Sequence, residues 1–221
     1  MCITELLPGE RYLALSYVWG RVANFELRRE SHESLLLPNS LSRHWSEIPR
    51  TIRDAILFIR EIRFTCLWAD SFSIIQNDDE HKALFIGRMA TIYSEAYLTI
   101  VAADGEDANH ELRGVGQSPR AAPPQTIIDL CSAGSVSIQT FGVQITLPQK
   151  YFKRAWTFQE YQLSSRLLVF IGNMVVWRCR EHEHRETLLH PELYGILPRY
   201  KNILDLSWPD FYCKNHNRLG R

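Results

Sequence analysis

Apolar residues occur in two patterns along the first hundred positions: short continuous runs and runs with helical spacing. Residues 11–19 are rich in apolar and aromatic side chains and stop at Gly20, which predicts a buried strand followed by a loop. Apolar residues at 48–62 recur at intervals of three and four, which predicts an amphipathic helix. Residues 64–68 form a second short apolar run, and we expect a second strand there.

The same alternation continues to residue 103. A helix is predicted from about Glu80 to Ala96, and an apolar strand at 97–102. Strands that alternate with helices pair in parallel through right-handed crossovers. We therefore expect an α/β fold with a mostly parallel central sheet and flanking helices. Ligands of such sheets bind beyond the carboxyl ends of the strands, and Asp70 is expected at one of these ends.

Other parts of the chain have weaker periodicity. Residues 21–45 mix charged, Ser, Asn and Pro residues, which predicts a loop with at most a short helix, and the Gly- and Pro-rich stretch 104–125 predicts a long loop. The second half of the chain is expected to add β-hairpins to the sheet. The expected elements are a hairpin at 126–130 and 135–141, a strand at 143–146, a helix at 152–164, and a hairpin at 166–171 and 174–179 that turns at Gly172-Asn173.

Composition narrows the class of protein. Hydrophobic residues make up 45% of the 221 positions and charged residues 23%, so a packed core is expected. Lys plus Arg and Asp plus Glu both number 25, so no net field attracts nucleic acid or an anionic membrane surface. We expect one domain over residues 1–180. Residues 181–221 are polar and irregular and predict a C-terminal extension without a core of its own.

Cysteine usage and hydropathy indicate the compartment. The five cysteines are an odd number, are widely spaced and include no CxxC pair, which is typical of free thiols under reducing conditions. No apolar run approaches the roughly 20 residues that a membrane-spanning helix needs. A cytoplasmic protein without a membrane span is therefore expected. Cys179, His182 and His184 carry metal-binding atoms, but no second pair follows at a structural-site spacing, so no metal is expected.

Four motifs occur in order along the chain and carry a family resemblance. They resemble the hallmarks of the fungal heterokaryon incompatibility (HET) domain. In this sequence they read ALSYVWG at 14–20, WADSFSIIQND at 68–78, MATIYSEAYLTIVAA at 89–103 and RAWTFQEYQLSSR at 154–166. The resemblance implies an effector of fungal non-self recognition and programmed cell death that is activated by a protein partner or by self-association. Ser73 stands where the family often has a cysteine, so this position offers no thiol chemistry.

The HET domain is in turn remotely similar to Toll/interleukin-receptor (TIR) domains, and this implies a flavodoxin-like sheet order. Some TIR domains cleave the bond between nicotinamide and ribose in NAD with a glutamate at the position matched here by Glu160. The resemblance thus implies Glu160 as the catalytic candidate and NAD as a possible substrate, with no bound cofactor. A carboxylate stabilises the oxocarbenium-like centre of such a reaction. The remaining candidates for ligand binding are Tyr17, Trp19, Gly20, Asp70, Gln76, Arg154 and Trp156.

Each candidate also has a structural interpretation, and the sequence leaves these alternatives open. Glu160 is a solvated or ion-paired helix residue on the structural view, and Trp156, one turn earlier, is a core residue. Asp70 either binds ligand, caps the next helix or pairs with Arg154. Gln76 is expected to shape the same loop. Whether the protein is an enzyme therefore remains open, and a non-catalytic interaction module is the third hypothesis.

Overall fold

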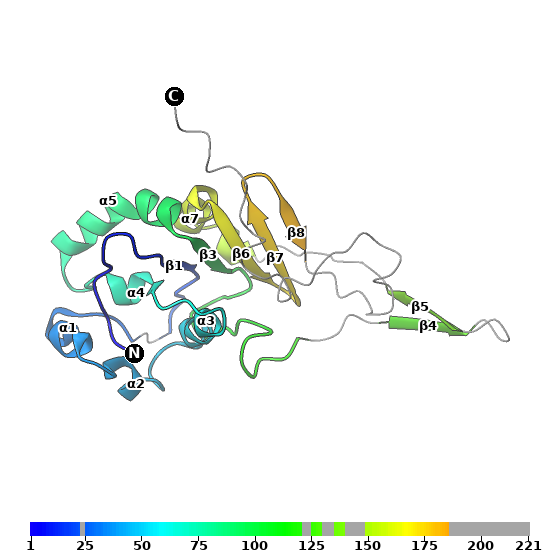
Figure 1. Ribbon diagram of the computed structural model, residues 1–221, viewed down its shortest axis with the longest axis horizontal. Coiled ribbons are helices and arrows are strands. Elements are labelled where there is room, and N and C mark those ends of the chain that lie inside the picture. Colours follow the sequence, from blue (N-terminus) through cyan, green and yellow to red (C-terminus); the bar gives the residue numbers. More distant parts are fainter. Residues whose placement is uncertain (23–24, 121–124, 130–134, 140–148, 186–221) are drawn as a thin grey trace, which may run out of the picture.

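The structure, a computed structural model, describes residues 1–22, 25–120, 125–129, 135–139 and 149–185 (Figure 1). A six-stranded sheet in the order β2-β1-β3-β6-β7-β8 forms the centre. The bounds of its strands are β1 Leu13–Ser16, β2 Leu67–Trp68, β3 Leu98–Ala102, β6 Arg166–Ile171, β7 Met174–Cys179 and β8 Glu183–Arg185. Strands β2, β1, β3 and β6 pair in parallel, whereas β7 pairs antiparallel with both β6 and β8. The predicted α/β class is confirmed, and the sheet is mixed.

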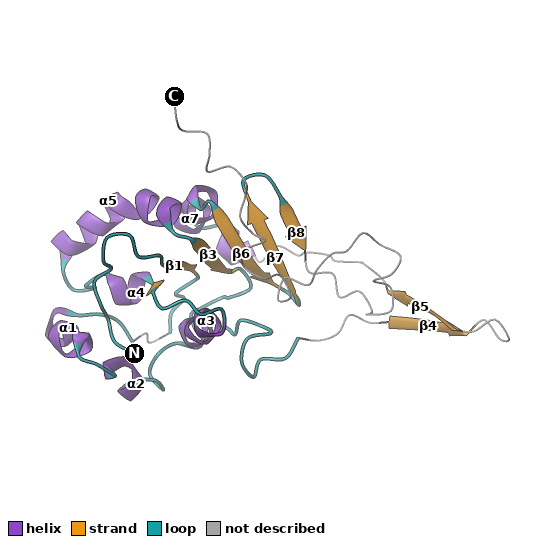
Figure 2. Ribbon diagram, in the orientation of Figure 1, coloured by secondary structure: helices purple, strands orange, loops and turns teal. Residues whose placement is uncertain are grey.

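Helices cover both faces of the sheet, as Figure 2 shows. On one face, α3 (Arg50–Glu61) packs through apolar residues such as Ile52 and Ile56 in the same cluster as Leu13, Leu15 and Ile100. The other face carries α5 (Asp79–Glu95), α6 (Gln149–Phe152) and α7 (Ala155–Leu163). Because β1 and β3 are covered on both sides, every residue in them is buried.

The predicted helices at 48–62 and 80–96 are confirmed as α3 and α5. Helix α5 begins after Asp78, whose side chain accepts a hydrogen bond from the His81 backbone N–H at 3.1 Å. The prediction of a strand at 64–68 was too long, because only Leu67 and Trp68 pair with β1. This strand lies at one edge of the sheet.

Two predictions about helices need correction. Residues 21–45 contain α1 (Arg29–Leu36) and the short α2 (Ser40–Arg43) rather than one short helix at most. Helix α1 buries only Leu35, so it lacks the apolar stripe that periodicity detects. The single helix expected at 152–164 is two helices, α6 and α7, because Arg154 has an extended backbone between them.

The expected hairpins are present. β4 (Gln125–Asp129) and β5 (Ser135–Gln139) form an antiparallel pair, and the expected strand at 143–146 lies outside the described residues. β6 and β7 pair around the Gly172-Asn173 turn. Since β8 pairs with β7, the sheet continues past residue 180, while the division at 180 remains a prediction. No helix among the described residues is long and apolar enough to cross a membrane.

Candidate functional site

The family motifs converge at the carboxyl ends of the parallel strands. Ser16 is the last residue of β1, and Asp70 is the first residue of the short helix α4 (Asp70–Ser73) that follows β2. Glu160 reaches the same region from α7, and Arg154 stands directly before that helix. The order of the strands reverses around β1, and such a switch point is the usual ligand position in open α/β sheets.

Glu160 is the central residue of this site. Its side chain is 7% exposed, and the Ser16 hydroxyl donates a hydrogen bond to Glu160 Oε2 at 2.5 Å. The same Ser16 oxygen is hydrogen-bonded to the Tyr151 hydroxyl. The three side chains thus form a buried chain that links α6, β1 and α7.

Helix α7 turns polar side chains toward the core and large apolar side chains toward solvent. It buries Thr157 and Glu160, whereas Trp156 and Phe158 are 48% and 55% exposed. Burying a carboxylate costs free energy unless hydrogen bonds compensate for the lost hydration. Such an arrangement is typical of sites at which function overrides stability.

The surroundings of Glu160 shift its protonation toward the neutral form. Burial raises the pKa of Glu160 to about 7, and the negative charge of Asp70 acts in the same direction. The hydrogen bond from Ser16 and the positive charge of Arg154 oppose this rise. The carboxyl group is therefore close to half ionised at neutral pH, which suits proton transfer as well as charge stabilisation.

Asp70 forms a second carboxylate centre. Trp19 Nε1 donates a hydrogen bond to Asp70 Oδ2 at 2.7 Å, and the Ser71 backbone N–H donates one to Oδ1 at 2.8 Å. Burial raises the pKa of Asp70 to about 6, and the bond from Trp19 partly offsets this. The ion pairs within 4.0 Å among the described residues do not include Asp70 with Arg154, but the positive charge of Arg154 opposes the rise in the pKa of Asp70. The pairing alternative stays a prediction.

Two further candidates shape the loops around this centre. Gln76 Nε2 donates hydrogen bonds to the carbonyl oxygens of Asp70 and Ile74, both at 3.0 Å, which confirms its expected role in the loop. Gly20 has φ of +72°, and a Cβ at this position would lie 2.2 Å from Asp107 Cβ. Gly20 therefore permits the close approach of the loop that follows β3.

The aromatic candidates lie in different environments. Tyr17 is 4% exposed, and its hydroxyl donates to Ser71 Oγ at 3.0 Å, so its core interpretation is confirmed. Trp19 is half-buried and stacks on Tyr17. The interpretation of Trp156 as a core residue is wrong, because its ring is half-exposed. The interpretation of Glu160 as a solvated residue is also wrong.

Sequence reasoning missed three residues of this site: Ser16, Tyr93 and Tyr151. Tyr93 donates to the Leu15 carbonyl oxygen at 3.2 Å, and burial together with the nearby Glu160 raises its pKa well above the usual value. The available signal was a single hydroxyl residue, Ser16, inside an otherwise apolar strand. A buried hydroxyl requires a partner, and this implies a polar residue beside the strand end.

The residues described by the structure contain no group of three or more His, Cys, Asp or Glu side chains that would hold a metal ion. In particular, Cys179, His182 and His184 do not form such a group. The side chains that act on the pKa of Glu160 are those of Ser16, Asp70, Tyr93 and Arg154.

Comparison with known proteins agrees with the motifs. The family model described as "Heterokaryon incompatibility protein (HET)" matches residues 12–160. The chain is similar to "Heterokaryon incompatibility protein 6, OR allele" of Neurospora crassa, with 25% identity over 76% of this chain and 30% of that protein. The chain thus spans about 30% of the length of this relative. No solved structure matches the chain. The match over residues 12–160 covers about two-thirds of the sequence, and the chain belongs to the heterokaryon incompatibility (HET) family.

Proposed function

We propose that the chain acts as an effector domain of fungal heterokaryon incompatibility, in which fusion of incompatible cells triggers programmed cell death. The observation that carries this proposal is the family match over residues 12–160, whose motif residues Ser16, Asp70 and Glu160 meet at one buried centre. A protein partner or a second copy of the chain activates the domain in this proposal, and the cytoplasm is its compartment.

Induced expression in a filamentous fungus tests this function. Expression of the chain is expected to reduce colony viability, and Glu160→Gln is expected to restore it, because the substitution removes the carboxylate at nearly constant volume. Glu61→Gln, on the exposed end of α3, is the matched control and should remain toxic. Equal viability with and without induction, at confirmed protein levels, contradicts the proposal.

A second candidate function is cleavage of NAD at Glu160. It is supported by a buried carboxyl group with a pKa near neutrality, together with the nearby charges of Asp70 and Arg154. The parallel strands in the order β2-β1-β3-β6 also agree with the flavodoxin-like order, which supports the proposed relation to TIR domains.

The chemistry of this candidate is a hydrolysis. The bond between nicotinamide and ribose breaks, neutral nicotinamide leaves with the bonding electrons, and water adds to the ribose carbon with release of a proton. Ionised Glu160 stabilises the positive charge that develops on the ribose. Since Glu160 is 7% exposed, substrate access requires displacement of α6 and α7, and association with a partner is the proposed trigger.

Nicotinamide release from NAD tests the enzymatic candidate. The assay uses concentrated protein with a crowding agent to favour assembly, and compares the native chain with Glu160→Gln and Glu61→Gln. Release that disappears only in Glu160→Gln supports NAD cleavage. If assembled native protein releases no nicotinamide but remains toxic in cells, the domain acts by binding rather than by catalysis.

A further inference from the structure

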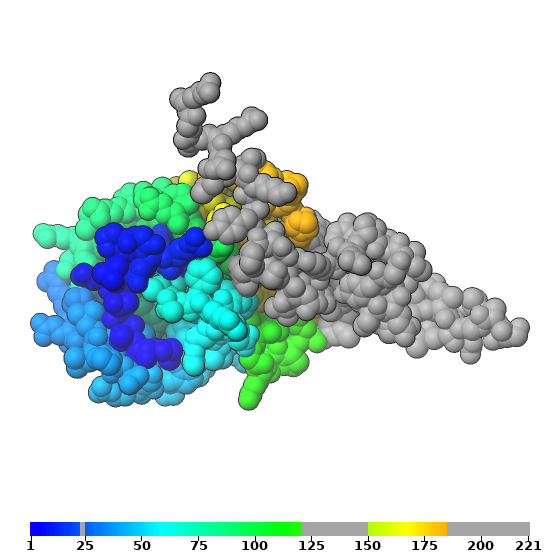
Figure 3. All heavy atoms as spheres, viewed as in Figure 1, coloured from blue at the N-terminus to red at the C-terminus, as the bar shows by residue number. Residues whose placement is uncertain are grey.

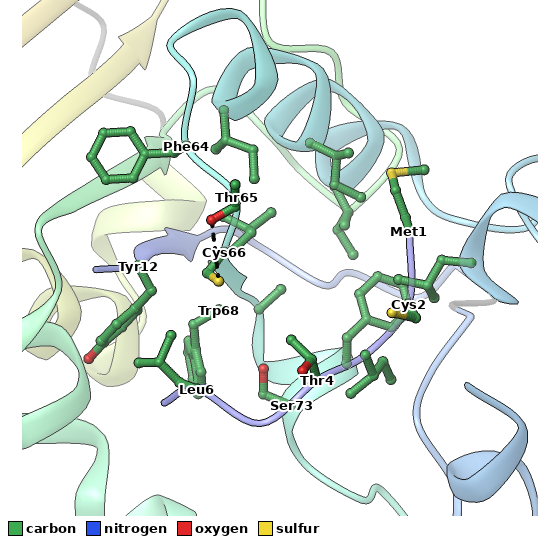
Figure 4. A pocket seen from close by; sticks show the side chains of 18 of the residues that line it. Met1, Cys2, Thr4, Leu6, Tyr12, Phe64, Thr65, Cys66, Trp68 and Ser73 are labelled. Carbon is green, nitrogen blue, oxygen red and sulfur yellow. Dashed lines mark hydrogen bonds between the residues drawn. The ribbon is translucent and has the colours of Figure 1, made fainter. Parts of the chain in front are cut away.

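A cavity of about 590 Å³ lies apart from the Glu160 centre, at the β2 edge of the sheet (Figure 4). Helices α3, α4 and α5 contribute to its walls together with residues 64–69, and the N-terminal residues Met1–Thr4 and Leu6 line its outer side. In the space-filling view the N-terminal segment forms a dark blue band beside the cyan surface of the chain that runs from the end of α3 through β2 to α4 (Figure 3). Glu160 does not line this cavity.

The lining is mainly apolar. Ile52, Ile56 and Ile59 of α3 face it together with Phe85 and Ile92 of α5. The cavity is partly open to solvent, so its apolar walls are exposed to water, and covering them with an apolar ligand is favourable. A space of this size and composition lies within the range of small-molecule sites.

Some polar atoms of the lining already have hydrogen-bond partners within the protein. The Tyr12 hydroxyl donates to the Ile92 carbonyl oxygen at 2.6 Å, and Thr4 Oγ1 donates to the Glu5 carbonyl oxygen at 3.3 Å. Cys66 Sγ lies 3.7 Å from Thr65 Oγ1, within hydrogen-bonding reach. Ser73 and Trp68 also line the cavity, and the Trp68 indole N–H is buried without a hydrogen-bond partner among the described residues. The apolar walls therefore carry a few polar groups, one of which could donate a hydrogen bond to a bound molecule.

The outer wall is fixed to the rest of the fold. The Ile3 backbone N–H donates to the Leu35 carbonyl oxygen at 2.9 Å, and the Leu41 N–H donates to the Met1 carbonyl oxygen at 3.2 Å. These bonds hold the N-terminal segment against α1 and α2. The N-terminal wall of the cavity is therefore backbone with defined hydrogen-bond partners.

Two opposite charges set the preferred ligand class. Arg60 in the last turn of α3 and Glu95 at the end of α5 both line the cavity. A cation and an anion at one site give no net preference for a charged ligand. We propose that this cavity binds an uncharged, mainly apolar small molecule that covers its apolar walls.

Nile red, an uncharged dye, and 1-decanol are the probes for a test on the whole chain. The dye is expected to bind at one site per chain with a blue shift in emission, and 1-decanol is expected to displace it. At a probe concentration of about 100 times Kd, linkage predicts a rise in Tm of roughly 5–10 °C. Absence of saturable binding contradicts the proposal, and tighter binding of decanoate than of 1-decanol contradicts the uncharged class.

A filling substitution locates the binding. Cys66→Trp places a large ring in the cavity and is expected to weaken Nile red binding at least tenfold. Leu84→Trp, on an exposed position of α5 outside the cavity, introduces the same residue and should leave binding unchanged. Equal binding by Cys66→Trp and the native chain would show that the dye occupies another surface, such as the exposed side chains of α5 and α7.

Thiol labelling of the native chain provides a second test that needs no folded variant. Cys66 and Cys179 are both partly buried cysteines, and of these two Cys66 lines the cavity, as Cys2 also does. Saturating 1-decanol is expected to slow the reaction of Cys66 with benzyl methanethiosulfonate several-fold and to leave that of Cys179 unchanged. Equal protection of both thiols, or of neither, contradicts the assignment.

Discussion

Ser16 and Glu160, which are 144 positions apart in the chain, share a buried hydrogen bond of 2.5 Å between the serine hydroxyl and a carboxylate oxygen. The bond joins the end of the first central strand to a helix near the end of the matched family region. It therefore connects the first and the last of the family motifs.

The pH dependence of stability is expected to change in Glu160→Gln. The pKa of Glu160 is raised in the folded state to about 7, so between the usual value of a glutamate and pH 7 the unfolded state binds fewer protons than the folded state. The native chain then loses stability as pH rises through this window, by about 1–3 kcal/mol from this group. Urea unfolding of both proteins between pH 4 and pH 8 measures the difference. Parallel stability curves contradict the raised pKa.

Ser16→Ala is expected to destabilise the fold by about 1–3 kcal/mol, because both Tyr151 and Glu160 lose a buried hydrogen-bond partner. The loss of a donor to the carboxylate also raises the pKa of Glu160 further. Ser46→Ala, at an exposed position, is the matched control and should change stability by less than about 0.5 kcal/mol. The urea midpoints of the two variants are compared with that of the native chain. Equal midpoints for Ser16→Ala and Ser46→Ala would contradict a stabilising role of the Ser16 hydrogen bonds.

Gly20→Ala and Gly9→Ala separate steric conflict from backbone strain. Both glycines have positive φ, of +72° and +88°, so an added Cβ costs about 1 kcal/mol at either position. Only at Gly20 does the new Cβ also meet the loop, at Asp107. Thermal melts should therefore show a larger loss of Tm for Gly20→Ala. A larger loss for Gly9→Ala would contradict the close approach.

Trp19→Phe keeps an aromatic ring but removes the indole donor to Asp70. The pKa of Asp70 is then expected to rise above its value of about 6, since this bond stabilises the ionised form. NMR titration of the carboxyl carbon of Asp70 measures the shift directly. Trp45→Phe serves as the control, because Trp45 packs against the same core but is not among the residues that hydrogen-bond to Asp70 or shift its pKa. An unchanged titration in Trp19→Phe contradicts the assigned bond.

The parallel part of the sheet was predictable because its pattern is local. Strands β1 and β3 are continuous apolar runs, and α3 has the spacing of an amphipathic helix. Helices α1 and α2 were not predictable in this way. They lack a clear apolar stripe, and they are hydrogen-bonded to the N-terminal segment, which lies far from them in the sequence. The break between α6 and α7 was not predicted for a similar reason. Nothing in the local sequence pattern indicates that the backbone of Arg154 is extended.

The site was predictable only in part. Glu160 and Asp70 came from the motifs, and the structure brings both to the same edge of the sheet. Ser16 and Tyr151 were missed because their roles depend on contacts over 135 positions or more. Trp156 was misjudged because hydrophobicity predicts burial, whereas α7 turns its carboxylate inward and its tryptophan outward.

The short border strands of the sheet have a consequence for aggregation. Strand β2 contributes two residues and β8 three, so among the described residues each border offers only a brief row of unpaired peptide groups. Long, flat borders recruit strands from other molecules, whereas brief ones give such additions little to pair with. Growth of this six-stranded sheet through several molecules is accordingly disfavoured at both of its borders.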